Sequence, residues 1–305
     1  MANVEMERAC EMWRGMWPQK EEPTIEDYRE AYDRFLEQFP VPDDVTVEKV
    51  DAGGVPSLWV STPGVSQSRT ILWLHGGGYV IGNAWHYREI TSHLGRAADA
   101  RALVVDYRLA PEHPFPAAVD DAVAAYRWLL AQGTSPQSIV IGGDSAGGGL
   151  ALATVLALKD AGEPLPAAVA TMSPWVDLEC SAETFTTKAE FDPVVSQEAV
   201  LGMAGMYLAG QDARAPLASP LFGDLKGLPP LLIHVGTRET LLDDSLHLAD
   251  RARSAGVDVT LEMVDEAPHV FQLFSSILPE GRGVRRGDRP VHPQARRRLR
   301  KGAHP

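Results

Sequence analysis

The most constraining feature of this sequence is a serine placed between glycines where a strand passes into a helix. Residues 143–147 read GDSAG, with Ser145 at the centre of a G-x-S-x-G element. The apolar run Ser138–Ile141 leads into it, and the Ala- and Leu-rich stretch 150–158 leads out. This context predicts a sharp turn that projects the serine Oγ above a sheet, near the N-terminus of the following helix. The element is typical of a nucleophilic serine; a glycine-rich turn that only closes a helix onto a sheet is the alternative.

A second glycine-rich segment follows an earlier strand-like run. Thr70–Leu74 continues directly into His75 and three consecutive glycines at 76–78. Consecutive glycines are entropically costly, and chains use them where the backbone must approach a ligand closely. Acyl transfer needs such a place, because backbone N–H groups stabilise the negative oxygen of the tetrahedral intermediate. The two motifs together favour acyl transfer more strongly than either does alone.

A third landmark, DYRLAPEHPFPAA at 106–118, precedes a helix-like stretch at 119–130. With these three motifs, the chain resembles the hormone-sensitive-lipase-like branch of the α/β-hydrolases, which are bacterial carboxylesterases with HGGG and GDSAGG. The resemblance extends from about residue 40 to about residue 278. It implies an α/β-hydrolase fold and a serine esterase activity.

Strand-like and helix-like segments alternate along the chain, which predicts an α/β protein with a mostly parallel central sheet and helices on both faces. Both glycine motifs fall at the carboxyl ends of expected strands, where the sites of such sheets gather. The expected strands are Ser57–Ser61, Thr70–Leu74, Ala102–Val105, Ser138–Ile141, Ala167–Thr171, Pro230–Val235 and Asp258–Val264. The expected helices between them are Trp85–Ala98, Ala117–Ala131, Gly148–Ala161 and Asp243–Ala255.

Two segments stand outside this alternation. Residues 1–40 read as two amphipathic helices, Met6–Trp17 and Thr24–Phe39, and a further helical insertion is expected at 183–209, within a catalytic domain of residues 41–281. The resemblance implies that these two segments form a small helical cap over the nucleophile. Ordinary peripheral packing is the alternative interpretation.

The other catalytic groups are expected in the order serine, acid, histidine. His269 follows the strand-like Val259–Val264, which is the position of the family's histidine. Family members usually carry an aspartate three residues after the glycine that ends the preceding strand, and here Glu239 takes that place. Asp243 and Asp244 stay open as alternative acids, with capping of the helix that begins there as their expected role.

The resemblance implies acyl transfer in two steps. Ser145 attacks an ester carbonyl, His269 takes its proton and Glu239 fixes the imidazole tautomer; water then hydrolyses the acyl-enzyme. The expected oxyanion hole consists of the N–H groups of Gly77 and Gly78, by resemblance, and of Ala146, by its position directly after the nucleophile. Asp144, beside the nucleophile, is expected to have a structural role.

The predicted substrates are small-molecule esters with short- to medium-chain acyl groups. A lactone hydrolase and an acetyl-ester deacetylase use the same triad, so the motifs do not separate these activities. The non-enzymatic alternative is a small-molecule receptor, since plant hormone receptors share the fold after losing the catalytic histidine. The presence of His269 argues against that alternative.

Composition and charge limit the remaining classes. The formal net charge of −13 argues against nucleic acid or an anionic membrane as a partner of the protein body. No apolar run is long enough to span a bilayer, and the acidic N-terminus does not read as a signal peptide. Cys10 and Cys180 fit neither a disulfide framework nor a metal site. We therefore expect a cytoplasmic protein without metal or cofactor.

The last residues depart from the family pattern. Residues 282–305 hold nine Lys and Arg against one Asp, whereas relatives continue into an amphipathic helix. This composition predicts a disordered or replaced basic tail. A tail that binds nucleic acid or membrane is the functional alternative. An apolar groove exposed by loss of the helix would make a second copy of the chain a candidate partner.

Overall fold

The computed structural model describes residues 4–275. A sheet of eight strands crosses their centre in the order β1-β2-β4-β3-β5-β6-β7-β8. β2 pairs antiparallel with both β1 and β4, and every pair from β4 to β8 is parallel. The predicted mostly parallel sheet is confirmed. The strands are β1 (Thr46–Asp51), β2 (Pro56–Ser61), β3 (Thr70–Leu74), β4 (Arg101–Val105), β5 (Ile139–Asp144), β6 (Ala168–Met172), β7 (Leu231–Gly236) and β8 (Val259–Val264).

The sequence predicts seven strands, and the structure adds β1 at one edge of the sheet. Every residue of β1 is exposed or half-buried, because the strand pairs only with β2. Charged residues such as Glu48 and Lys49 interrupt its apolar pattern, which hides the strand from a search for apolar runs. Charged side chains are a common protection of edge strands against pairing with other chains.

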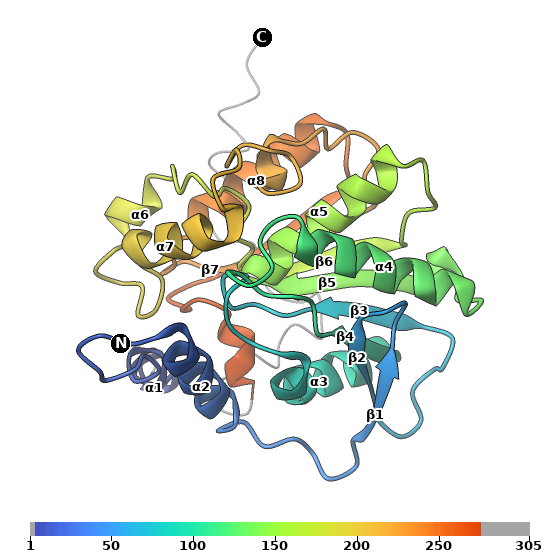
Figure 1. Cartoon of the computed structure of the whole chain (residues 1–305), viewed down its shortest axis with the longest axis horizontal. Helices are drawn as coiled ribbons and strands as arrows, with labels where there is room; N and C mark the ends of the chain where they lie inside the picture. Colours follow the sequence, from blue (N-terminus) through green and yellow to red (C-terminus); the bar gives the residue numbers. More distant parts are fainter. Residues whose placement is uncertain (1–3, 276–305) are drawn as a thin grey trace.

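Helices cover both faces of the sheet, as predicted. Figure 1 shows α4, α5 and α8 on one side of the strands and α3 on the other. α5 is buried along almost its whole length, so its Ala- and Leu-rich sequence lacks a polar face. These helices are α3 (Arg88–Ala98), α4 (Ala117–Ala131), α5 (Ala146–Asp160) and α8 (Leu242–Ser254); 3-10 turns lie at η1 (Ala84–Tyr87), η2 (Pro136–Ser138), η3 (Pro220–Phe222) and η4 (Phe271–Phe274).

Both N-terminal helices end three residues before their predicted ends at Trp17 and Phe39, as α1 (Val4–Arg14) and α2 (Ile25–Leu36). Thr24 is the N-cap of α2 and forms a capping box with Asp27, which explains where this helix begins. Trp13 stacks on Phe35 with ring centroids 4.4 Å apart and meets Phe274 of η4 edge-on at 5.7 Å. The N-terminal pair of helices is thus packed against the segment that follows β8.

The expected insertion at 183–209 contains two helices, the single turn α6 (Thr184–Thr187) and α7 (Gln197–Leu208). The residues between them are non-helical, so the single long insertion predicted as helical is interrupted. Figure 1 shows α6 and α7 at the same end of the sheet as α1 and α2, at the left of the view, with α6 and α7 above and α1 and α2 below. The basic tail predicted at 282–305 and the last six residues of the predicted domain 41–281 lie outside the described residues.

Candidate active site

Ser145 occupies the turn between β5 and α5, in a backbone conformation that residues other than glycine rarely adopt. Its φ is +52° and its ψ is −122°, and its N–H donates to Met172 O at 2.8 Å. A Cβ at Gly147 would come within 2.0 Å of Leu74 O, so only glycine allows helix α5 to approach β3 this closely. Strain of this kind, held by the surrounding backbone, is common at functional sites.

The HGGG segment leaves β3 and passes beside this turn. Gly77 and Gly78 have φ values of +106° and +61°, which glycine adopts without penalty. Within residues 4–275, the N–H groups of Gly77, Gly78 and Ala146 donate no hydrogen bond to protein groups. Buried N–H groups are normally paired, so three free donors near one serine are suited to receive an anionic oxygen.

The predicted acid and base meet directly. His269 Nδ1 lies 2.9 Å from Glu239 Oε2, and both side chains are almost completely buried. The other carboxylate oxygen, Oε1, accepts from Ser173 Oγ at 2.7 Å and from Gly236 N at 2.6 Å. The Ser173 hydroxyl also accepts from Val270 N at 3.1 Å, so one side chain connects the acid to the histidine loop.

The structure places the two alternative acids elsewhere. Asp243 Oδ2 accepts from Thr184 N at 3.3 Å, and Asp244 Oδ2 accepts from the N–H groups of Val176 and Asp177 at 2.9 and 3.1 Å. The predicted capping role is wrong, because α8 begins at Leu242 with Leu241 at its N-cap and no side-chain cap. The two aspartates instead fix neighbouring loops to α8.

Ser145, His269, Gly77 and Gly78 line one cavity that is open to solvent. Its other lining residues are mostly apolar, and nine of them come from the predicted cap segments: Trp13, Met16, Trp17 and Tyr32 from the first forty residues, and Val194, Val195, Ala199, Val200 and Met203 from the insertion. A Cβ at Gly78 would lie 2.2 Å from Met203 Sδ, so the insertion touches the glycine loop directly. A mostly apolar lining with a few polar groups is typical of a small-molecule site.

Electrostatics favour a basic imidazole. Burial lowers the pKa of His269, but the hydrogen bond and charge of Glu239, with smaller contributions from Asp192 and Asp144, raise it above its ordinary value. Burial raises the pKa of Glu239, and its hydrogen bonds to His269, Ser173 and Gly236 oppose that shift. The buried pair thus holds the imidazole in one orientation with Nδ1 directed at the carboxylate.

Asp144 forms hydrogen bonds with the glycine loop and none with the histidine. Its Oδ1 accepts from Gly76 N at 3.1 Å and its Oδ2 from the Tyr87 hydroxyl at 2.9 Å. Burial raises the pKa of Asp144 to about 7, against the effect of these hydrogen bonds. This placement agrees with the structural role expected from the sequence.

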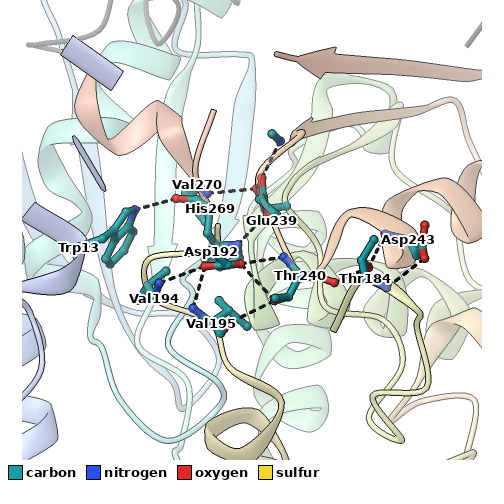
Figure 2. A network of polar contacts seen from close by, with 12 residues as sticks. Trp13, Thr184, Asp192, Val194, Val195, Glu239, Thr240, Asp243, His269 and Val270 are labelled. Atoms are coloured by element: carbon teal, nitrogen blue, oxygen red, sulfur yellow. Dashed lines mark hydrogen bonds and ion pairs between the residues drawn. The ribbon is translucent and has the colours of Figure 1, made fainter. Parts of the chain in front are cut away.

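Sequence reasoning missed three residues of this neighbourhood. Ser173 connects Glu239 to the histidine loop. Trp13 donates to His269 O at 2.8 Å, and Asp192 binds the backbone next to Glu239 (Figure 2). Ser173 directly follows β6, so its position at the carboxyl end of a parallel strand was the available signal. Trp13 and Asp192 come from the cap segments and carry no such signal.

Among residues 4–275, no group of three His, Cys, Asp or Glu side chains is arranged to hold a metal ion. In the same part of the chain, no helix combines the length and apolarity needed to cross a membrane. Cys10 and Cys180 are both buried and free.

Comparison with known proteins gives consistent matches. Residues 71–273 match a family described as alpha/beta hydrolase fold. An acetyl-hydrolase of Streptomyces hygroscopicus is 46% identical, with 92% of this chain and 94% of that protein covered. An esterase of Acinetobacter venetianus is 35% identical, over 83% of this chain and 84% of its own.

Solved structures give the same result. An esterase of the bacterial hormone-sensitive lipase family superposes with a TM-score of 0.91 at 51% identity, covering 93% of this chain and 96% of its own. The esterase EstE5, soaked with p-nitrophenyl butyrate, has a TM-score of 0.88 at 46% identity, covering 93% and 95% respectively.

Proposed function

This chain belongs to the alpha/beta hydrolase fold family, in its hormone-sensitive-lipase-like branch, and is an ester hydrolase; from that premise we propose that Ser145, His269 and Glu239 are its catalytic triad. The observation that carries the proposal is the contact between His269 Nδ1 and Glu239 Oε2 at the cavity that Ser145 also lines. A carboxylate, an imidazole and a strained serine then act in the order that acyl transfer requires.

In the first step, the Ser145 hydroxyl attacks the ester carbonyl as His269 Nε2 accepts its proton. Glu239 keeps the Nδ1 proton in place and stabilises the imidazolium that forms. The N–H groups of Gly77, Gly78 and Ala146 receive the oxyanion, an interaction for which loss of one donor typically costs about 10²–10³ in rate. His269 then protonates the leaving alcohol, and water repeats the sequence on the acyl-enzyme.

We propose short- to medium-chain acyl esters as the substrates. The apolar residues of the two cap segments enclose the cavity, which supports a preference for small acyl groups. An acetyl ester is favoured within this class by the similarity to the Streptomyces acetyl-hydrolase. Lactone hydrolysis uses the same groups and is a second candidate activity.

A substrate panel tests this proposal. The p-nitrophenyl esters of acetate, butyrate, octanoate and laurate, a γ-lactone and an acetylated sugar are compared for kcat/KM, with Ser145→Ala as the matched inactive control. We expect the highest value for acetate or butyrate and a decline towards laurate. Turnover equal to that of Ser145→Ala on every substrate would contradict the proposal.

A cytoplasmic location and a homo-oligomeric state remain predictions. The two buried free cysteines support a reducing compartment. Cell fractionation tests the location, and light scattering of the purified full chain tests the oligomeric state.

A further inference from the structure

Asp192 is a carboxylate of the cap that accepts four hydrogen bonds, two from its own loop and two from Thr240. It lies in the non-helical stretch between α6 and α7. Its Oδ1 accepts from Val194 N at 3.0 Å and from Val195 N at 2.9 Å, which shapes the loop that forms part of the cavity wall. Its Oδ2 accepts from Thr240 N at 2.8 Å and lies 3.1 Å from the Thr240 hydroxyl oxygen. Figure 2 shows this carboxylate between the two loops.

Thr240 connects this cluster to the proposed acid. Its N–H belongs to the peptide bond that follows Glu239, and its side chain is completely buried. Its carbonyl accepts from Thr184 Oγ1 at 2.6 Å, so the insertion binds both polar groups of its backbone. The backbone that carries Glu239 is therefore held from the cap side as well as from β7.

Within residues 4–275, the carboxylate of Asp192 forms no ion pair with Lys or Arg, and all its hydrogen-bond donors there are neutral. Its negative charge acts on His269 and is one cause of the raised pKa of that histidine. His269 faces two further carboxyl groups, Glu239 from the loop after β7 and Asp144 from the end of β5.

We propose that Asp192 is a positioning residue for ester hydrolysis, which holds the cap against the peptide after Glu239 and places a negative charge facing His269. The proposal rests on the triad proposed above. The position of the cavity wall and the orientation of the acid are coupled, because the same carboxylate shapes the cavity wall and binds Thr240. The charge favours the imidazolium that forms when Ser145 loses its proton.

Asp192→Asn is the principal test. The amide retains one oxygen for Val194 and Val195 but presents N–H groups to the Thr240 N–H and removes the charge. We expect kcat to fall about 10- to 100-fold, as misplacement by ~1 Å can cost 10²-fold, with KM changed less. Because loss of the negative charge lowers the pKa of His269, the acidic midpoint of kcat/KM against pH should move to lower pH by roughly half a unit. This is less than the pKa shift of about 1–3 units that an opposite charge within ~4–6 Å produces.

Two further variants separate the charge from the contact. Thr240→Val removes the hydroxyl and keeps the Asp192 charge, so kcat should fall while the acidic midpoint stays in place. Asp192→Glu keeps the negative charge but displaces the carboxylate from Thr240, so kcat should again fall while the acidic midpoint stays in place. Asp192→Glu also keeps the proposal testable if Asp192→Asn does not fold, since parental kcat in Asp192→Glu would refute the positioning role.

Asp212→Asn is the matched control. Asp212 also accepts from a nearby backbone N–H, that of Arg214 at 2.9 Å, but it is exposed and not part of the cavity lining. This variant should retain parental kcat and pH profile. A lower melting temperature in Asp192→Asn with an unchanged kcat and acidic midpoint would overturn the proposal, because Asp192 would then be merely structural. Activity retained by Ser145→Ala would instead refute the triad on which the proposal rests.

Discussion

Replacing Glu239 by glutamine should disable the histidine while leaving the fold almost unchanged. Two donors, Ser173 Oγ and Gly236 N, face Oε1 at 2.7 and 2.6 Å, so the amide oxygen of glutamine must occupy that position. The amide nitrogen then replaces Oε2, 2.9 Å from His269 Nδ1. Two N–H groups do not face each other at this distance, so Nδ1 becomes the acceptor and the ring proton moves to Nε2. Nε2 is the atom that has to accept the serine proton.

The expected loss is large because the wrong tautomer is fixed by the protein. The equivalent change in a serine protease lowers kcat about 10⁴-fold, which corresponds to ~5.5 kcal/mol of transition-state stabilisation. The assay is kcat on p-nitrophenyl butyrate, with circular dichroism and the melting temperature as checks of folding. Since the amide conserves volume and most hydrogen bonds, we expect the melting temperature to change by only a few degrees.

Asp243→Asn is the control for this substitution. Its carboxylate contacts Thr184 and not the histidine, so kcat should stay within a few-fold of the parent. If Glu239→Gln retained more than about a tenth of parental kcat while Asp243→Asn collapsed, the assignment of the acid would be reversed.

Three further predictions follow from the site. Ser145→Ala should reduce turnover to the level of buffer and leave the melting temperature unchanged, because Ser145 Oγ makes no hydrogen bond within residues 4–275; residual turnover above buffer would contradict its role. Ser173→Ala should lower kcat and cost about 1–3 kcal/mol of stability, since Val270 N loses its partner, a fall of about 2–4 °C per kcal/mol by calorimetry. Because neutral His269 is the active form and its pKa lies above 6.5, kcat/KM should decline as the pH falls through that higher value, and an acidic midpoint below 6.5 would refute this reasoning.

The local motifs were predictable because their geometry is encoded within a few residues. The turn at Ser145 needs only a strand, small neighbours and a helix, and all three are visible in the sequence. The parallel sheet was likewise predictable from alternating apolar and helical segments. β1 was not, because an edge strand has little apolar surface to bury.

The pairing of Glu239 with His269 was expected from the family resemblance, with Asp243 and Asp244 left open, but the other contacts between distant loops were beyond the sequence pattern. Glu239 and Asp243 lie four positions apart, and only packing decides that the first meets His269 while the second meets Thr184. Asp192 reaches Thr240 across 48 positions, from a stretch with no periodicity to mark it. The hydrogen bonding of these loops depends on contacts between segments far apart in the sequence, which no single segment encodes.

The hydrogen bond from Trp13 to the His269 carbonyl has a practical consequence for engineering this enzyme. α1 has 11 residues, too few for a stable isolated helix, so its order depends on the aromatic packing beneath it. In a series of N-terminal deletions, the variant that loses Trp13 would lose part of the cavity wall and the support of the histidine loop together. N-terminal truncations or bulky N-terminal fusions would therefore show low activity in a screen, even where the central sheet folds normally.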